Sequence, residues 1–439
     1  MRSLSSLLFF ILLTGISACK KKDVNECPFC PSVQSISPST GPAYTTLTIT
    51  GKNFSSVPKE NIIKINGITI NPDSILLGNQ TQLVVKVPKG CGTGPVTVDL
   101  DDELTNYGEP PVFTYQYRNV SEDLVPLINQ AHPVACSGGS TTGLNKFELP
   151  AGIIMDTKGD IFFADYKASC LLKLSLNDNY KTPCLFAGTC YKTGNTDGVG
   201  TAATFTTPRF ICIDNSNNLF IAENTLSIRN VTNNGNVITL FKDSSLVSLS
   251  GVALLKSNNA IIYAASLTNQ VIYKIVRNGT NYMLSLFAGT KGVKGYVDGP
   301  GSVAKFNLPQ DMVTDKEGNL FVADATNNVI RKITPTGIVS TFAGNGSPVF
   351  SDGQGINASF HTPLGLFIDE EENIFVADNG NNAIRKISKT GLVSTIYTFT
   401  EKTDNPKPND VVRDIHGNFY VTYMFDNNGN TGIKKISTQ

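Results

Sequence analysis

One spacing of residues recurs along the last two thirds of the chain and limits its fold more than any other feature. A proline is followed six residues later by an aspartate, and after six more residues by an aromatic residue. The five copies are Pro150/Asp156/Phe162, Pro208/Asp214/Phe220, Pro309/Asp315/Phe321, Pro363/Asp369/Phe375 and Pro408/Asp414/Tyr420. A weaker copy at 261–265 lacks the acid. A period of about 53 residues over 122–437 predicts stacked units that bury a shared core.

Each unit contains four short strand-like runs separated by Asp-Gly, Gly-Asn or Asn-Asn turns, which is typical of a propeller blade. The strings Asn-Leu-Phe-Val-Ala-Asp at 319–324 and Ile-Arg-Lys-Ile at 330–333 resemble NHL repeats. This resemblance implies a six-bladed β-propeller over 118–439. Five blades remain the alternative if the weaker copy is not a blade.

The last unit stops at its third strand, at 433–436, so its outer strand must come from elsewhere. Leu124–Asn129 is the available candidate. A strand from the beginning of the repeat region would complete the last blade, close the ring and remove an exposed edge.

A different pattern precedes the repeats. Apolar and polar residues alternate at Val33/Ser35 and Leu47/Ile49, and short strands follow about every 10 residues with turns between them, which favours an antiparallel sandwich. Ser-Pro-x-x-Gly-Pro at 37–42, Ile-Thr-Gly-x-Asn-Phe at 49–54 and Ile-Asn-Gly at 65–67 resemble the IPT/TIG family. The resemblance implies an immunoglobulin-like domain over 31–117. The expected fold class of the whole chain is all-β.

The N-terminus has the pattern of an export signal. Arg2 precedes a short apolar run at 7–13, too short for the ~20 residues that span a bilayer. Ile-Ser-Ala-Cys at 16–19 resembles the bacterial lipobox, which implies a lipoprotein signal peptide at 1–18, a lipid anchor on Cys19 and a tether at 19–30. An ordinary secretory signal is the alternative. The charged residues after Cys19 resemble the export tag of Bacteroidetes surface lipoproteins, so we expect an outer-membrane lipoprotein, periplasmic or surface-exposed.

Eight cysteines remain after Cys19, and an exported compartment permits disulfides among them. Cys27 and Cys30 are close enough for a small structural disulfide. Cys170 and Cys184 lie on strands expected to be neighbours, so they are a second candidate pair.

The charge balance excludes one class of partner. Lys and Arg total 36 and Asp and Glu total 36, so the chain offers no field that would attract a polyanion. We therefore expect no nucleic-acid partner.

The aspartate repeated at Asp165, Asp324 and Asp378 has two interpretations. In two copies an arginine follows seven residues later, at Arg331 and Arg385. We interpret the acid as a turn cap or a carboxylate–guanidinium pair repeated from blade to blade, because a function shared equally by several blades would be unusual.

Positions that differ between copies are better candidates for binding. The residues just after the proline of each inner strand are expected near the channel mouth, on the face of the long loops 189–207 and 290–308. The candidate ligand-binding rim is Arg209, Gln310, Asp311, Asn409 and Asp410. The alternative is that these side chains only solvate the rim.

Two functions follow from this organisation. The first is a lipid-anchored binding protein of the cell envelope whose loop face recognises a glycan or an envelope protein, without a cofactor. The absence of Trp leaves Tyr166, Tyr191 and Tyr296 to stack on sugars. The second is a metal-dependent hydrolase or lyase, similar to propeller lactonases, with calcium at the channel mouth. We name no catalytic residue, and the three histidines occupy different repeat positions.

Overall fold

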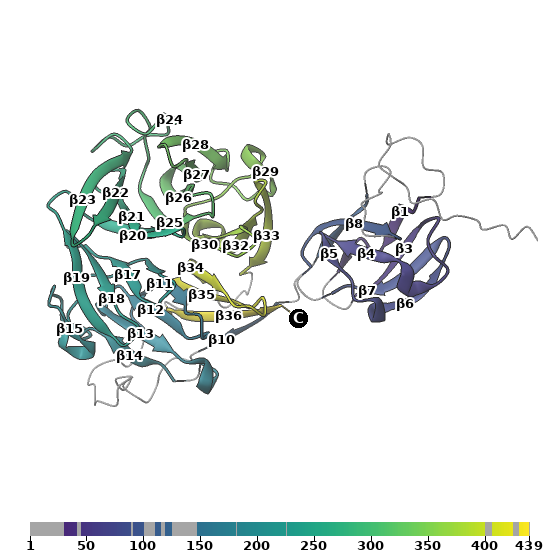
Figure 1. Ribbon diagram of the computed structural model, residues 1–439, viewed down its shortest axis with the longest axis horizontal. Coiled ribbons are helices and arrows are strands. Elements are labelled where there is room, and N and C mark those ends of the chain that lie inside the picture. Colours follow the sequence, from purple (N-terminus) through teal and green to yellow (C-terminus); the bar gives the residue numbers. More distant parts are fainter. Residues whose placement is uncertain are drawn as a thin grey trace, which may run out of the picture. The chain divides into compact units, whose positions relative to one another are not determined.

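The computed structural model describes residues 30–41, 45–88, 91–100, 110–115, 119–124, 147–180, 182–224, 226–399, 406–424 and 430–438. The expected signal peptide, Cys19 and nearly all of the tether lie outside these residues. The chain divides into two compact units, Met1–Arg118 and Asn119–Thr438, which are described separately (Figure 1). No helix within the described ranges has the length and apolar character needed to cross a membrane.

The first unit is a sandwich of two sheets. One sheet has the order β1 (Ser32–Ser37), β3 (Thr46–Lys52), β7 (Gln82–Lys86) and β6 (Ile75–Asn79). The other has the order β2 (Thr40–Gly41), β9 (Val112–Tyr115), β8 (Gly94–Asp99), β4 (Ile62–Ile65) and β5 (Ile68–Thr69). Short 3₁₀ turns are η1 (Pro58–Glu60) and η2 (Pro72–Ser74).

The core of the sandwich comes from alternate residues of these strands. Leu47 and Ile49 of β3 and Val96 and Val98 of β8 are fully buried and belong to the same apolar cluster. Side chains alternate between the two faces of a strand, so the apolar set faces inward and its polar neighbours face solvent. The alternation read from the sequence therefore marks the buried faces.

The second unit contains, within its described residues, six antiparallel sheets around a central axis (Figure 1). The first sheet consists of β11 (Pro150–Met155), β12 (Ile161–Asp165), β13 (Cys170–Leu174) and β14 (Cys184–Ala187). The second consists of β16 (Ile211–Ile213), β17 (Leu219–Ala222), β18 (Ser227–Val231) and β19 (Asn236–Lys242). The third consists of β20 (Leu249–Leu255), β21 (Asn258–Ser266), β22 (Val271–Asn278) and β23 (Asn281–Ala288). The weaker repeat copy thus forms a regular four-stranded sheet.

The other three sheets have the same strand order. The fourth consists of β25 (Pro309–Thr314), β26 (Leu320–Asp324), β27 (Val329–Ile333) and β28 (Ile338–Ala343). The fifth consists of β30 (Pro363–Ile368), β31 (Ile374–Asp378), β32 (Ala383–Ile387) and β33 (Leu392–Thr398). The sixth consists of β34 (Lys407–Arg413), β35 (Phe419–Met424), β36 (Gly432–Thr438) and β10 (Asn119–Asp123). Two-residue strands β15 (Gly198–Val199), β24 (Gly299–Pro300) and β29 (Gly353–Gln354) extend three outer edges. The remaining 3₁₀ turns are η3 (Leu176–Asp178), η4 (Gly200–Ala202), η5 (Ala325–Asn327), η6 (Gly355–Asn357) and η7 (Asn379–Asn381).

The first strand of each sheet is the inner strand: β11, β16, β20, β25, β30 and β34. Each of them contacts the inner strands of both neighbouring sheets, and β34 contacts β11. The inner strands therefore form a closed ring. The expected all-β class, with a sandwich and a propeller, is confirmed.

The strand that completes the last sheet is β10, which pairs with β36 from Asn119↔Thr438 to Asp123↔Lys434. The sequence prediction placed this strand at Leu124–Asn129, and that position was wrong. Leu124 still donates its N–H to the carbonyl of Ile433 at 3.1 Å, and 125–129 lie outside the described residues.

A buried arginine joins each long loop to its blade in three sheets. Arg331 is fully buried; its Nη1 lies 2.8 Å from Oδ2 of Asp324 and its Nη2 lies 2.5 Å from Oδ1 of Asp298 in the long loop. The same guanidinium donates to two loop carbonyls and stacks on Phe306 and Tyr296. Arg385 and Arg229 make equivalent contacts.

The repeated aspartate also caps the loop that enters the blade. Oδ1 of Asp324 accepts the backbone N–H of Asn307 at 2.7 Å, and Asp165 accepts N–H groups from Glu148, Leu149 and Ala168. Both structural interpretations of this acid, the turn cap and the carboxylate–guanidinium pair, are therefore right.

One disulfide differs from the pair suggested by the sequence. Cys170 is bonded to Cys190, not to Cys184. The bond ties β13 to the following long loop. Cys30 and Cys184 each take part in a disulfide as well. Among the described cysteines, Cys91 and Cys212 are free.

Candidate functional site

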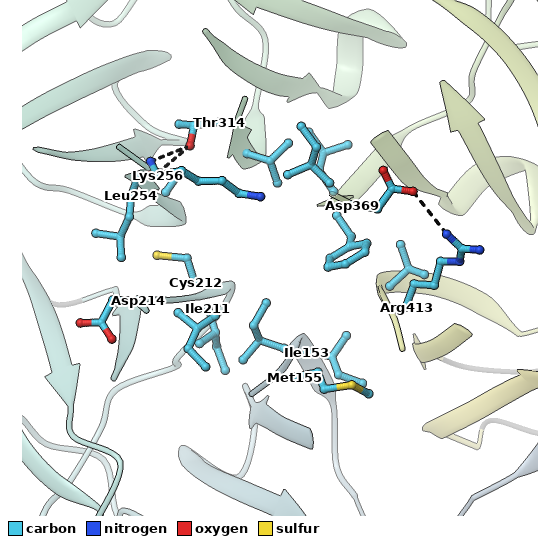
Figure 2. A pocket seen from close by; sticks show the side chains of 18 of the residues that line it. Ile153, Met155, Ile211, Cys212, Asp214, Leu254, Lys256, Thr314, Asp369 and Arg413 are labelled. Atoms are coloured by element: carbon cyan, nitrogen blue, oxygen red, sulfur yellow. Dashed lines mark hydrogen bonds and ion pairs between the residues drawn. The ribbon is translucent and has the colours of Figure 1, made fainter. Parts of the chain in front are cut away.

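The inner strands enclose a cavity of about 650 Å³ in the centre of the propeller (Figure 2). Its walls come from the later residues of five of these strands, from all three residues of β16 and from the turns that follow the strands. The apolar lining residues are Ile153, Ile154, Met155, Ile211, Ile213, Ala253, Leu254, Met312, Val313, Leu366, Phe367, Ile368, Val411 and Ile415. Because the long loops precede the inner strands, the cavity lies toward the opposite end of the ring from those loops.

Inner strands approach one another closely because small and large residues alternate around the ring. Two positions after the repeat proline, and two after Leu249 in the weaker copy, the residues are Gly152, Phe210, Gly251, Asp311, Gly365 and Asp410. A Cβ on Gly365 would lie 2.6 Å from the Cα of Asp410, and one on Gly251 would lie 3.0 Å from the Cα of Asp311. Each glycine thus makes room for the backbone of the strand that carries a larger residue.

The structure separates the five residues of the predicted rim. Asp311 and Asp410 line the cavity and are buried. Gln310 and Asn409 immediately precede lining residues and Arg209 lies two positions before one, but none of the three is itself among the lining residues. Arg209 instead stacks its guanidinium over the ring of Tyr166, with 4.9 Å from Cζ to the ring centroid.

The two buried aspartates join strands across blade boundaries. Oδ2 of Asp311 on β25 accepts the N–H of Leu366 on β30 at 2.9 Å, and Oδ2 of Asp410 on β34 accepts the N–H of Ile153 on β11 at 2.8 Å. Oδ1 of Asp410 also accepts the N–H of Val411 at 2.8 Å. These bonds fix the orientation of both carboxyl groups beside the apolar wall.

Burial changes the protonation of this pair. It raises the pKa of Asp311 to about 7, because the charged form loses more hydration than the backbone N–H groups restore. Burial raises the pKa of Asp410 well above its usual range, and the charge of Asp311 adds to the effect. Since the two groups titrate together, the pair holds at least one proton near neutral pH.

The cavity lining as a whole carries more acidic than basic side chains. Seven carboxyl side chains line the cavity: Asp214, Asp311, Asp369, Glu370, Glu371, Asp410 and Asp414. The cationic lining residues are Lys256 and Arg413. Arg413 donates from Nη1 to Oδ2 of Asp369 at 3.3 Å, whereas Lys256 is exposed and extends toward the open centre (Figure 2).

Cys212 is the one free thiol in this lining, as far as the described residues show. Its sulfur points away from the open centre, toward Leu254 (Figure 2), and the side chain packs against the apolar cluster that includes Leu254. Burial raises the pKa of the thiol well above its usual range, with smaller contributions from Asp311 and Asp214, so the thiol is neutral at physiological pH.

We tested the calcium alternative against these residues. Calcium takes six to eight oxygen ligands, and the oxygens of Asp410 and one of Asp311 already accept backbone N–H groups. No group of three or more His, Cys, Asp or Glu residues within the described ranges is arranged to hold a metal ion. The cavity residues do not fit a calcium site, and we derive no metal-dependent step.

Sequence reasoning missed the apolar wall and the end of the ring at which the cavity lies. The repeat copies did contain one signal: two positions after the repeat proline, glycine alternates with a larger residue from copy to copy. Aligning the six copies would have separated Asp311 and Asp410 from Gln310 and Asn409.

Comparisons with known proteins support the fold of both units. The family model of the IPT/TIG domain matches residues 31–117. NHL repeat-containing protein 2 of Homo sapiens is 32% identical over 148 residues, which cover 33% of this chain and 20% of that protein. The chain thus spans a fifth of the length of that relative.

Two solved structures are similar over nearly the whole chain. A structural-genomics protein of unknown function from Bacteroides thetaiotaomicron VPI-5482 has a TM-score of 0.55 and 15% identity, with 93% of this chain and 98% of that chain covered. An auxiliary nutrient binding protein from the same organism has a TM-score of 0.52 and 14% identity, with 94% and 98% covered. At these identities the likeness shows the fold. The chain is an all-β protein in which an IPT/TIG domain precedes a β-propeller similar to NHL-repeat proteins.

Proposed function

We propose that this protein is a binding protein of the cell envelope that takes a small organic ligand into the central cavity of a six-bladed propeller. The proposal includes a lipid anchor on Cys19 in the outer membrane. The observation that carries it is the cavity itself, whose volume and mostly apolar wall with a few fixed polar groups are typical of small-molecule sites. The fold shared with an auxiliary nutrient binding protein supports the same class of function.

A fluorescent probe tests whether the cavity binds ligands. We expect N-phenyl-1-naphthylamine, a neutral apolar dye, to gain fluorescence on entering the cavity. Lys256→Trp should weaken its binding by about tenfold or more, because the indole would fill part of the open centre toward which the Lys256 side chain extends (Figure 2). Lys256→Met is the matched control, since it removes the charge without adding a ring. Equal binding by the Trp and Met variants would exclude the cavity as the site.

A glycan site on the long-loop face is the second candidate. Tyr191, Tyr296 and Phe350 lie in long loops and expose 44–50% of their surface. Tyr296 and Phe350 occupy equivalent places, each over the guanidinium of a buried arginine that holds the ring in position. Half-exposed, fixed aromatic rings are suited to stacking on sugars.

Affinity gels containing starch, xylan or dextran test this second candidate. We expect a glycan that binds there to retard the wild-type protein and to lose most of that retardation with Tyr296→Ala. Ile415→Ala, at an exposed residue beside the cavity, is the control. Absence of retardation by all three glycans argues against a site for polymers of these kinds.

A further inference from the structure

Asp311 and Asp410 lack the cation that accompanies several other buried acids of the propeller. Within the described residues Asp165 lacks one too, but it caps a loop and does not line the cavity. The acids Glu223, Asp324 and Asp378 each pair with a buried arginine. Neither Asp311 nor Asp410 forms an ion pair with any Lys or Arg of the described residues, and hydrogen bonds to them come from backbone N–H groups. The two carboxyl groups therefore lie at the cavity wall without a Lys or Arg paired to either of them.

The surroundings of the pair contain few other groups that titrate. The inner strands β11, β20 and β30 carry no titratable side chain. Cys212 on β16 interacts with Asp311, and its thiol is neutral. On β34 the other titratable residues are Lys407 and Arg413 at the strand ends, and Arg413 pairs with Asp369. A positive charge that enters the cavity would thus meet Asp311 and Asp410 without a competing basic group beside them.

The charge of the whole lining favours the same sign of ligand. With both buried aspartates neutral, five carboxylates remain against two cations. Lys256 is exposed at the mouth, so solvent screens its charge. A cleft with an excess of one charge and low-dielectric walls concentrates ions of the opposite sign.

We propose that Asp311 and Asp410 recognise the positively charged group of an organic cation, such as a primary ammonium, whose apolar part packs against the aliphatic wall. The proposal rests on the cavity being a ligand site. An ammonium donates hydrogen bonds and carries the charge that the pair lacks, and a buried charge-assisted hydrogen bond is worth more than a neutral one. Apolar residues such as Ile153, Leu366 and Phe367 receive the remainder of the ligand.

Binding of a cation should displace a proton from the pair. The empty pair holds a proton near neutral pH, whereas a bound ammonium stabilises the ionised carboxylates. Affinity for the cation should therefore increase as the pH rises through about 7, the pKa of Asp311. A neutral ligand of the same shape would show no such dependence.

Isothermal titration calorimetry on the full chain tests the proposal with three matched probes: phenethylamine, 2-phenylethanol and 3-phenylpropanoate. They share a phenyl ring and a two-carbon chain and differ in the charge of the end group. We expect phenethylamine to bind about tenfold or more tightly than the alcohol, and the carboxylate to bind most weakly. Equal affinities for the amine and the alcohol would overturn the proposal.

Variants identify the residues responsible. Asp410→Asn should remove most of the preference for phenethylamine over 2-phenylethanol. Asp73→Asn, in the first unit and exposed, is the control. A folded Asp410→Asn variant that still prefers the amine contradicts the assignment.

The wild-type protein provides a readout that needs no variant. Titrations of phenethylamine in two buffers with different ionisation enthalpies should show release of protons near pH 7. Binding of the amine without proton release would overturn the proposal. If N-phenyl-1-naphthylamine binds but the amine has no advantage, the cation site fails alone. If neither the dye nor any of the three probes binds, the proposed cavity function fails with it.

Discussion

Arg331→Met is expected to lower the free energy of unfolding of the propeller by about 3–5 kcal/mol. Arg331 is fully buried and its guanidinium contacts Asp324, Asp298 and two loop carbonyls. Methionine fills much of the same volume but leaves the buried Asp324 carboxylate without its counter-charge. The long loop at 290–308 also loses its attachment to the blade.

Far-UV circular dichroism during urea denaturation measures this effect, since the chain has no Trp for fluorescence. Arg277→Met is the matched control, because Arg277 is exposed and donates a local hydrogen bond from Nε to the carbonyl of Gly279. The control should change stability by less than about 0.5 kcal/mol. A similar, small change in both variants would contradict the role assigned to the buried pair.

The second large effect concerns pH. The pKa of Asp311 is about 7 in the folded protein and about 4 in an unfolded chain, so the folded state holds a proton that the unfolded state has lost between those values. Stability must therefore fall as the pH rises from about 4 to about 7, by up to about 4 kcal/mol for this group. The raised pKa of Asp410 acts in the same direction and extends the fall to higher pH.

The double variant Asp311→Asn/Asp410→Asn separates this contribution from other buried acids. Burial also raises the pKa of Asp165, Asp324 and Asp378, which would contribute with the same sign. We expect the wild type to lose stability relative to the double variant as the pH increases from about 5 to 8, in urea denaturation at each pH. Parallel curves for the two proteins would show that the pair is ionised in the folded state.

The repeat spacing predicted the sheets well because it encodes local geometry. Four of the five prolines are the first or second residue of an inner strand, and Pro208 lies three residues before β16. Each repeat aspartate accepts N–H groups in the turn that follows, as Asp214 does from Ser216 and Asn218. Such signals act within a few residues, so a single copy is sufficient to read them. Even the weak copy, which lacks the acid, retains enough alternation in β21 to form its sheet.

Features that depend on distant segments were predicted less well. The closing strand β10 pairs with residues more than 300 positions away, and its register is decided by β36 rather than by its own sequence. The partner of Cys170 is fixed by the path of a long loop to Cys190, not by strand adjacency. The cavity combines side chains from six strands, so no single copy shows at which end of the ring it lies.

The pairing of β10 with β36 also determines an order of events during synthesis. The last sheet cannot be completed until Gly432–Thr438 has left the ribosome and any export channel, because these residues provide the partner of β10. Until then the ring of blades is open and β10 has no strand to pair with. A nascent chain of this protein is therefore most exposed to proteolysis and aggregation just before β36 emerges.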